Sequence, residues 1–215
     1  MPYKLLVFDW DGTIIDSAST IAECIRDASR DLGLEVPDRE RATHVIGLGL
    51  HDAMRIAVPD LPASRYPQFV ESYRRHFLER KDHMQLFGGM RELLEQLSQS
   101  HLLAIATGKS RRGLDRDLGY HGLKKLFVAS RCADETNPKP HPAMLREIME
   151  ELTVEPRAAL MIGDTSHDMD MARAAEVDAL AVTYGAHPEA GLRACLPLHC
   201  VADVPSLARW LKQNA

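Results

Sequence analysis

The sequence predicts an α/β protein in which a parallel β-sheet is covered by helices on both faces. Short apolar runs without polar alternation recur along the chain, as expected for strands that are buried on both sides. The segments between several of these runs place apolar residues at helical spacing. This alternation of strand and helix predicts a doubly wound, Rossmann-like sheet, in which ligands bind at the carboxyl ends of the strands.

The apolar runs give the expected strands, which are in chain order 5–8, 102–106, 126–129, 158–162 and 179–182. Helices are expected over 91–100 and 141–152, because apolar side chains there recur every three or four positions on one stripe. Since consecutive parallel strands need crossover connections, these helices are expected to cover the faces of the sheet.

The segment 17–86 interrupts this alternation, because it contains no convincing buried strand. Apolar stripes at helical spacing run from 21 to 32 and from 66 to 77. The segment is much longer than an ordinary crossover, which favours an inserted helical-bundle cap over helices that simply pack on the sheet. The expected domains are therefore an α/β core of 1–16 and 87–215, and a helical cap of 17–86. The stripe 66–77 is expected to form the core of the cap.

The composition limits the class of partner. Lysine and arginine total 26 against 31 acidic residues, for a net charge of −5, so the basic footprint of a nucleic-acid binder is absent. Four scattered cysteines without metal-ligand spacing favour a reducing cytoplasm. Neither a signal peptide nor a membrane-spanning run is expected. A cytoplasmic protein with a small-molecule partner is expected, and the sequence does not indicate an oligomeric state.

Two aspartates two positions apart, Asp9 and Asp11, directly follow the first expected strand. Extended backbone projects them to the same side, where their charges repel unless a cation lies nearby. One interpretation is a turn, because Asp-Gly is common turn chemistry and an acid often caps a helix. The other is a Mg²⁺-assisted nucleophile paired with a general acid. The pair alone leaves both interpretations open.

Three further polar clusters, 107–110, 137–142 and 163–168, adjoin other expected elements of the sheet. Because the carboxyl ends of parallel strands share one edge, these clusters should converge with Asp9 and Asp11. The converged set would contain acids, a lysine, a hydroxyl and backbone amides. Such groups suit a site that binds Mg²⁺ and a phosphate group.

The four clusters resemble, in order, the four motifs of the haloacid dehalogenase superfamily of phosphohydrolases. They read DWDGT at 9–13, ATGKS at 106–110, NPKPHP at 137–142 and GDTSHD at 163–168. The resemblance covers essentially the whole chain, and the inserted helices resemble the superfamily's helical cap of the first type. The sequence is most similar to the phosphoglycolate phosphatase-like members. The resemblance implies a phosphatase of small phosphomonoesters, either phosphoglycolate-like or sugar phosphates.

The resemblance also assigns catalytic roles. Asp9 would be the nucleophile, forming an aspartyl-phosphate, and Asp11 would protonate the leaving alcohol and then deprotonate the water. The cofactor Mg²⁺ would be held by the Asp9 side chain, the backbone carbonyl of Asp11 and Asp164. Lys139 would pair with both the phosphate and Asp9. Thr107 and the amide of its neighbour, as well as backbone of the cap loop 45–50, would approach the phosphate.

The phosphate-binding residues implied are thus Thr107, Gly108, Lys139 and, from the cap loop, Gly47. Asp168 would orient Lys139 or a metal-bound water, and Thr13 would support the site.

Each softer role has a structural alternative that stays open. Thr107 could be only a helix N-cap, Asp168 could be a solvated helix acid, and Lys109 is interpreted as surface charge.

Several related activities stay open as alternatives. A β-phosphoglucomutase-like phosphotransferase shares the core motifs, whereas a dehalogenase is disfavoured by Asp11. A phosphonate hydrolase of this superfamily uses a cap lysine, and the cap offers only Lys81. A non-catalytic binding protein on the same fold is the remaining alternative. Near the cap loop, His44, His51 and Arg55 could contact the substrate or form a solvated rim.

Overall fold

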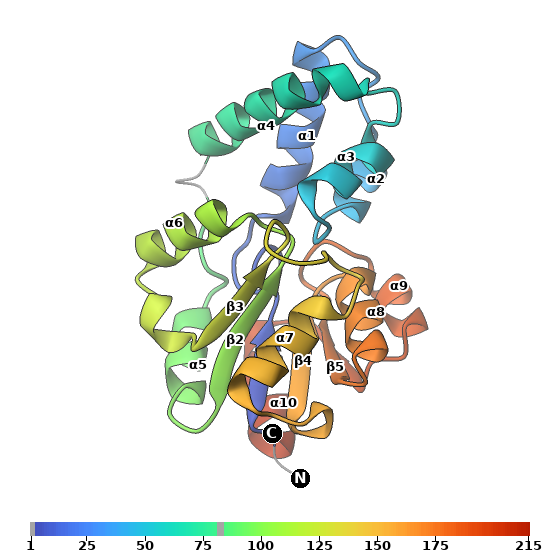
Figure 1. Cartoon of the computed structure of the whole chain (residues 1–215). Helices are drawn as coiled ribbons and strands as arrows, with labels where there is room; N and C mark the ends of the chain where they lie inside the picture. The colour runs from blue at the N-terminus through green and yellow to red at the C-terminus, as the bar shows by residue number, and fades with distance from the viewer. Residues whose placement is uncertain (1–2, 81–83) are drawn as a thin grey trace.

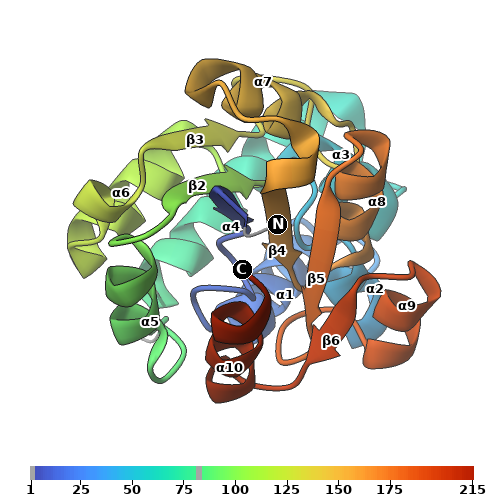
Figure 2. The same ribbon diagram turned by 90° about the horizontal axis from the view of Figure 1, so that it is seen from below.

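The computed structural model describes residues 3–80 and 84–215. Six strands form one parallel sheet in the order β3-β2-β1-β4-β5-β6 (Figures 1 and 2). The strands are β1 (Leu5–Phe8), β2 (Leu102–Thr107), β3 (Ala129–Cys132), β4 (Ala159–Gly163), β5 (Asp178–Val182) and β6 (His199–Val201). The predicted doubly wound fold class is confirmed, with β1 at the centre of the sheet.

Two details of the sheet differ from the sequence prediction. Residues 124–126, at the start of the third expected strand, form the 3-10 turn η3 (Lys124–Leu126), and β3 begins only at Ala129. The apolar run 126–129 therefore marks the approach to the strand rather than the strand itself. The edge strand β6 was missed because it is three residues long and begins with the exposed His199. Such a short edge strand lacks the continuous apolar pattern of a buried one.

Helices cover both faces of the sheet (Figure 2). They are α5 (Met90–Leu97), α6 (Arg111–His121), α7 (Ala143–Leu152), α8 (Ser166–Ala174), α9 (Glu189–Ala194) and α10 (Val204–Asn214). Because side chains alternate along β1, Leu6 and Phe8 join one apolar cluster with α5, α6 and α10. Leu5 and Val7 join a second cluster with α7 and α8. Every residue of β1 is thus buried, as its unalternating sequence predicts.

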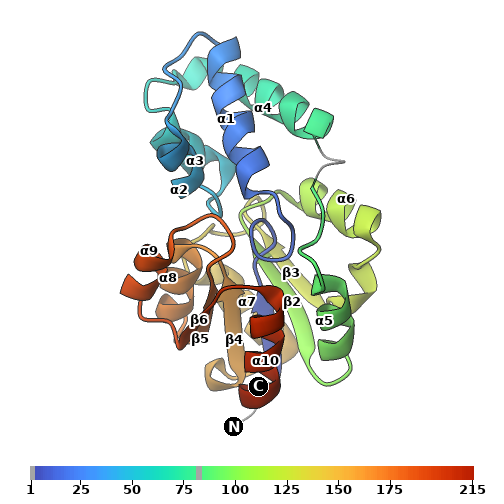
Figure 3. The ribbon, with the colours of Figure 1, turned by 180° about the vertical axis from the view of Figure 1, so that it is seen from behind.

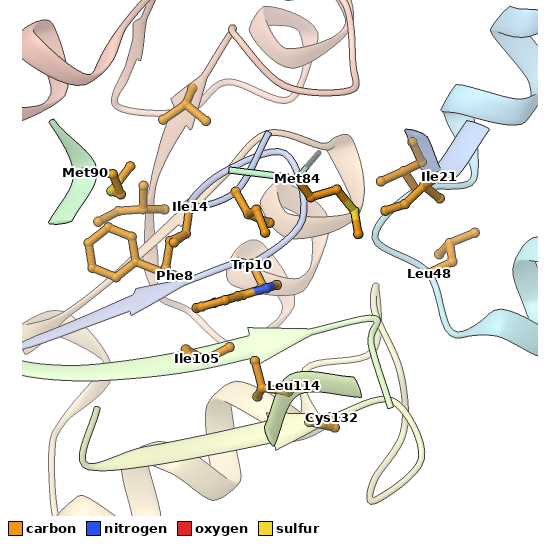
Figure 4. Close-up of a cluster of buried hydrophobic side chains, with 14 of the residues drawn as sticks. Phe8, Trp10, Ile14, Ile21, Leu48, Met84, Met90, Ile105, Leu114 and Cys132 are labelled. Atoms are coloured by element: carbon orange, nitrogen blue, oxygen red, sulfur yellow. The ribbon is translucent and has the colours of Figure 1, made fainter. Parts of the chain in front are cut away.

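Four helices lie over the carboxyl edge of the sheet (Figures 1 and 3). They are α1 (Ala18–Asp31), α2 (Arg39–His44), α3 (Leu50–Ala57) and α4 (Tyr66–Arg80), with the short turn η1 (Ala63–Arg65) before α4. We call them the cap helices and the rest of the fold the core. The apolar cluster that contains Phe8 and Trp10 continues into the cap through Ile21 and Leu48 (Figure 4). Trp10 packs edge-on against Phe127, which supports its interpretation as a packing residue.

The chain leaves the core and returns to it through two segments that are hydrogen-bonded to each other. The Asp16 amide donates to the Gln85 carbonyl, and the Phe87 amide donates to the Ile14 carbonyl. The predicted domain boundaries, 16–17 and 86–87, fall in these paired segments. Within the described ranges, no helix is both long and apolar enough to cross a membrane.

Candidate active site

The four polar clusters of the sequence come together beneath the cap helices, at the carboxyl edge of the sheet (Figure 1). Loops 9–13, 107–110 and 164–168 follow β1, β2 and β4, while loop 137–142 precedes α7. Parallel strands all end at this edge, and their loops therefore meet here although they are distant in sequence.

Asp9 is buried, and only one of its carboxylate oxygens is partnered. Its Oδ1 accepts a hydrogen bond from the Trp10 amide at 2.6 Å and lies 2.9 Å from Nζ of Lys139. Its Oδ2 has no hydrogen-bond partner among the described residues. Burial raises the pKa of Asp9 well above its ordinary value; Lys139 opposes this rise, while Asp168 and Asp164 add to it. The unpartnered oxygen is therefore available to a cation or an electrophile.

Lys139 is fully buried and pairs with a second carboxylate. Its Nζ lies 2.6 Å from Oδ1 of Asp168, whose other oxygen accepts hydrogen bonds from the amide and hydroxyl of Thr165. The bond from the Thr165 amide, together with the bond that the Asp168 amide donates to the Thr165 hydroxyl, forms a capping box at the start of α8. Asp168 thus caps a helix and holds Lys139 at the same time. Its interpretation as a solvated helix acid is wrong, because its exposed fraction is 0%.

Asp164 is oriented by both of its oxygens. Oδ1 accepts a hydrogen bond from the Thr13 hydroxyl at 2.7 Å, and Oδ2 accepts one from the Ala186 amide at 2.7 Å. Burial and the charge of Asp168 raise the pKa of Asp164 to about 7. Gly12 allows the close approach of this side chain, because a Cβ at that position would collide with Asp164 and its φ is +83°.

The buried acids fit a divalent metal ion. Asp9, Asp164 and Asp168 each present one oxygen, and these oxygens lie within 4.8 Å of one another. Carboxylate oxygens are the ligands that Mg²⁺ prefers. Burial, and after it the neighbouring acids, raises the pKa of Asp9 and of Asp164, and a bound cation would favour their ionised forms. Lys139 is the single ammonium paired with this set in the described ranges. We call Asp9, Lys139, Asp164 and Asp168 the core centre.

Asp11 points to a different set of partners. Its Oδ1 accepts a hydrogen bond from the Ser17 hydroxyl at 2.8 Å, and Nζ of Lys109 lies 3.0 and 2.9 Å from its two oxygens. The carboxylate of Asp11 is therefore not part of the acid cluster. The metal contact that the resemblance assigns to this residue concerns its backbone carbonyl.

Lys109 is a site residue that the sequence interpretation missed. Its side chain is 9% exposed and pairs with Asp11 and, at 3.3 Å, with Asp117 of α6. The interpretation as surface charge is wrong. The available signal was its place directly after Thr107 and Gly108, at the end of a strand that leads into the site. We call Asp11, Lys109 and Asp117 the cap-side centre.

Thr107 is buried at the end of β2, and its hydroxyl accepts a hydrogen bond from the Lys109 amide at 3.2 Å. The hydroxyl proton is thus free for an acceptor such as a phosphate oxygen. The alternative that Thr107 is the N-cap of α6 is wrong, because Ser110 holds that position and accepts from the Gly113 amide.

The cap loop 45–49 lies directly on the loops of the core. A Cβ at Gly108 would collide with the backbone carbonyls of Gly47 and Leu48, and one at Gly47 would lie 3.1 Å from the hydroxyl of Thr165. A Cβ at Gly49 would lie 3.2 Å from Pro138. The glycines therefore let the backbones of cap and core approach closely at the mouth of the site.

A cavity of about 950 Å³ extends from Asp9 and Asp11 between the cap and the core. Its cap wall is mostly apolar, and Arg112 and Arg116 of α6 add positive charge. The stripe 66–77, expected to be cap core, has two roles: Phe69 and Phe77 are buried, while Phe77 also lines the cavity together with Tyr66, Val70 and Tyr73. The cavity is large enough to hold the leaving group of a small phosphate ester.

The remaining cap residues that the sequence analysis named differ in whether they reach the cavity. His51 lines the cavity, while Arg55 is largely exposed and pairs with Asp52 at 3.7 Å. His44 touches the core through its backbone carbonyl, which accepts a hydrogen bond from His167. Lys81 lies outside the described residues.

Comparisons of this chain with a family model and with known proteins indicate the same family. A family model described as haloacid dehalogenase-like hydrolase matches residues 6–182. The chain is 34% identical to the probable phosphatase IndB of Dickeya dadantii, over 90% of this chain and 86% of that protein. It is 31% identical to a phosphoglycolate phosphatase of Chromobacterium violaceum, over 96% of both.

One further relative and one solved structure are also similar to this chain. The chain is 31% identical to the tyrosine-protein kinase PtkA of Mycobacterium tuberculosis, over 85% of this chain and 62% of that protein. Among solved structures, a haloacid dehalogenase-like family hydrolase of Streptococcus pneumoniae superposes with a TM-score of 0.82 at 25% identity. The superposition covers 97% of this chain and 98% of that one.

Proposed function

The chain belongs to the haloacid dehalogenase-like hydrolase family and is a phosphatase, and we propose that it hydrolyses a small phosphomonoester with Mg²⁺ through a phosphorylated Asp9. The observation that carries this proposal is the buried Asp9 carboxylate, which has one oxygen held by Trp10 and Lys139 and the other unpartnered. A nucleophile needs such a free oxygen in a fixed orientation.

In the first step, the free oxygen of Asp9 bonds to phosphorus while the ester P–O bond breaks. Asp11, protonated before this step, gives its proton to the departing alcohol oxygen and becomes a carboxylate. In the second step, water attacks phosphorus, Asp11 takes a proton from that water, and the bond to Asp9 breaks to release inorganic phosphate. Lys139 and Thr107 orient the phosphoryl oxygens from buried positions.

Asp9, Asp164 and the backbone carbonyl of Asp11 would hold Mg²⁺, with Asp168 beside them. When bound, the ion would neutralise charge on the phosphoryl oxygens and on the acids. A carboxylate and a phosphate repel each other, and this neutralisation allows them to approach.

The proposed substrates are phosphoglycolate-like compounds or sugar phosphates, in the cytoplasm. The relative from Chromobacterium violaceum supports the former, because its name is phosphoglycolate phosphatase. A panel of phosphoglycolate, sugar phosphates, nucleoside monophosphates and pyrophosphate would identify the substrate. With β-glucose 1-phosphate in the panel, formation of glucose 6-phosphate would reveal a phosphotransferase instead.

The nucleophile is tested by assaying the purified protein and Asp9→Asn with p-nitrophenyl phosphate, with Mg²⁺ and with EDTA. We expect Asp9→Asn to lose at least about 10³-fold in kcat, as for other nucleophile deletions. Undiminished turnover in this variant, or indifference to EDTA, would contradict the mechanism. A second readout does not depend on activity: Mg²⁺ should raise the melting temperature of the wild type more than that of Asp164→Asn.

A further inference from the structure

Lys109 lies where the end of β2 meets the start of α6, between two carboxylates. Its Nζ contacts both oxygens of Asp11, at 3.0 and 2.9 Å, and lies 3.3 Å from Oδ2 of Asp117. These contacts with Asp11 and Asp117 fix the ammonium on the side of the core.

The other side of the ammonium faces the cap. Nζ lies 4.8 Å from the ring centroid of Phe77, a buried residue of α4. A cation over an aromatic face is attracted by the negative face of the ring, more strongly where water is excluded. The Arg116 guanidinium lies 5.3 Å from the same ring and pairs with Asp117, but no contact joins it to Asp11 among the described residues. Lys109 is thus the cation that joins the cap ring to Asp11.

The second partner of Asp11 also belongs to the path into the cap. Ser17 directly precedes α1, and its hydroxyl donates to Oδ1 of Asp11 at 2.8 Å. Both groups that hold this carboxylate, the hydroxyl and the ammonium, are therefore connected to cap helices. By contrast, Asp9 is held by Trp10 and Lys139, both of the core. Asp11, unlike Asp9, therefore has partners that connect it to the cap.

We propose that Lys109 is a positioning residue that, through its contact with Phe77, couples the position of the cap to the alignment of the Asp11 carboxylate. The inference rests on the proposed function, in which Asp11 hands a proton to the leaving alcohol. With the cap in place, the ring, the ammonium and the carboxylate form a continuous series of contacts. With the cap displaced, the ammonium loses the ring and keeps only its two carboxylates, so the position of the Asp11 carboxylate is less restricted.

The dependence of kcat on the leaving group tests this role, because a variant with only a structural defect would slow all esters equally. When the ester bond to phosphorus breaks, an alkoxide needs the proton from Asp11, whereas p-nitrophenolate leaves as a stable anion and needs it little. General acid catalysis contributes about 10²–10⁴-fold where it is needed. A misaligned Asp11 should therefore slow the hydrolysis of alkyl phosphates far more than that of p-nitrophenyl phosphate.

The experiment measures kcat and KM of the full chain for glycerol phosphate and p-nitrophenyl phosphate. We expect Lys109→Met to reduce kcat for the alkyl ester at least about tenfold more than for the aryl ester. Lys109→Arg should recover part of this ratio. Phe77→Leu, which keeps apolar volume but removes the ring, should shift the ratio in the same direction by about two- to fivefold.

Arg116→Met is the matched control, because it removes a cation from the same ring and from the same Asp117 without touching Asp11. Because Arg116 also lines the cavity, its loss should change the kinetics of both esters together, and the ratio of alkyl to aryl kcat should equal that of the wild type. Equal losses for both esters in Lys109→Met, or a shift in Arg116→Met as large as in Lys109→Met, would overturn the coupling. Should Lys109→Met fail to fold, an unchanged ratio in Phe77→Leu would overturn it.

A failure of the proposed function can be distinguished from a failure of this inference. If Asp9→Asn retains full turnover, the phosphatase mechanism itself is wrong. If Asp9→Asn is inactive and the leaving-group ratio is unchanged in the folded Lys109 and Phe77 variants, only the role of Lys109 is wrong.

Discussion

The core centre and the cap-side centre each place a lysine between two aspartates, and the core centre adds a third aspartate, Asp164, but their surroundings differ. Lys139 has 0% side-chain exposure, and its two carboxylate partners both belong to the core. Lys109 retains 9% side-chain exposure, faces the cavity and contacts Phe77 of the cap. The first centre is fixed by the sheet, whereas the second depends on where the cap lies.

In the proposed mechanism, this difference divides the reaction between the two centres. Bond formation at phosphorus is common to every phosphate ester, and the groups proposed to perform it belong to the core centre. Protonation depends on the leaving group, and Asp11, the proposed acid, is held by Ser17 and Lys109. The cap helices also form much of the cavity wall. Under the proposal, the cap would therefore both enclose the leaving group and contact, through Phe77, the lysine that holds the acid.

Lys139→Met gives the largest expected effect and the clearest contrast with the cap-side centre. We expect kcat to fall by about 10²–10³-fold or more, because a buried donor to the phosphoryl group is lost. The loss should be equal for alkyl and aryl esters, since no leaving group contacts Lys139. Steady-state kinetics with both esters tests this; a loss confined to alkyl esters would erase the distinction between the two centres.

The same variant should also be less stable. Removing one partner of a buried ion pair costs about 3–5 kcal/mol, and Lys139→Met leaves Asp9 and Asp168 without their ammonium. Urea unfolding without metal measures this cost, and added Mg²⁺ should restore part of it. Lys124→Met, which removes an exposed lysine, is the control and should stay within about 0.5 kcal/mol of the wild type.

The two centres also show how far the sequence predicts this site. The sequence placed Asp9, Lys139 and Asp164 together because each lies in a motif at the edge of one sheet, and the parallel fold brings such edges together. It did not place Lys109, because the partners of this lysine are Asp11, 98 positions away, and a ring on an inserted helix. Contacts between cap and core follow from how two separately packed units meet, which no local pattern encodes.

The fold shows the same limit. The central strands were predicted within about one residue at each end, because complete burial leaves an unalternating apolar run. At the edges, β3 was displaced and β6 was missed, because half-exposed strands carry polar residues such as Ser130 and His199. Similarly, the apolar stripe of α4 indicated a helix but not that Tyr73 and Phe77 face a cavity.

Gly108→Ala should displace the cap while leaving both lysines in place. Its methyl group would collide with the carbonyls of Gly47 and Leu48, which are backbone atoms and cannot rotate away. If the cap loop lifts to relieve about 1–3 kcal/mol of overpacking, kcat/KM should fall by about 10–100-fold. The loss should be larger for alkyl than for aryl esters, because the cap-side centre is disturbed and the core centre is not.

Gly119→Ala is the control for this change, because it lies on α6 with no atom within 4 Å of the added methyl group. It should keep full activity and gain about 0.4–1 kcal/mol of stability, since alanine restricts the unfolded chain. Equal activity in Gly108→Ala and Gly119→Ala would show that closure of the cap loop on Gly108 has no part in turnover.

The smallest expected effect is that of pH on a second contact between cap and core, away from Lys109. The carbonyl of His44, at the end of α2, accepts hydrogen bonds from Nε2 of His167 at 2.9 Å and of His187 at 3.0 Å. Nδ1 of His187 in turn accepts from the Ser166 amide at 3.1 Å, so His187 is bonded in its neutral form. Protonation of Nδ1 would break the bond to Ser166 and place a charge beside the His167 ring.

Acid should therefore weaken this contact. Burial, with His167 nearby, lowers the pKa of His187 to about 4, against 6.5 for an unperturbed histidine. Because the unfolded chain binds the proton more readily, the stabilisation is complete above pH 6.5 and is lost as the pH falls toward 4, by at most about 3 kcal/mol. His187→Asn keeps an acceptor for the Ser166 amide but does not titrate. The gap in unfolding free energy between wild type and His187→Asn should therefore shrink from pH 7 to pH 4. A gap that stays constant over this range would show that the cap is held at this contact independently of the charge on His187.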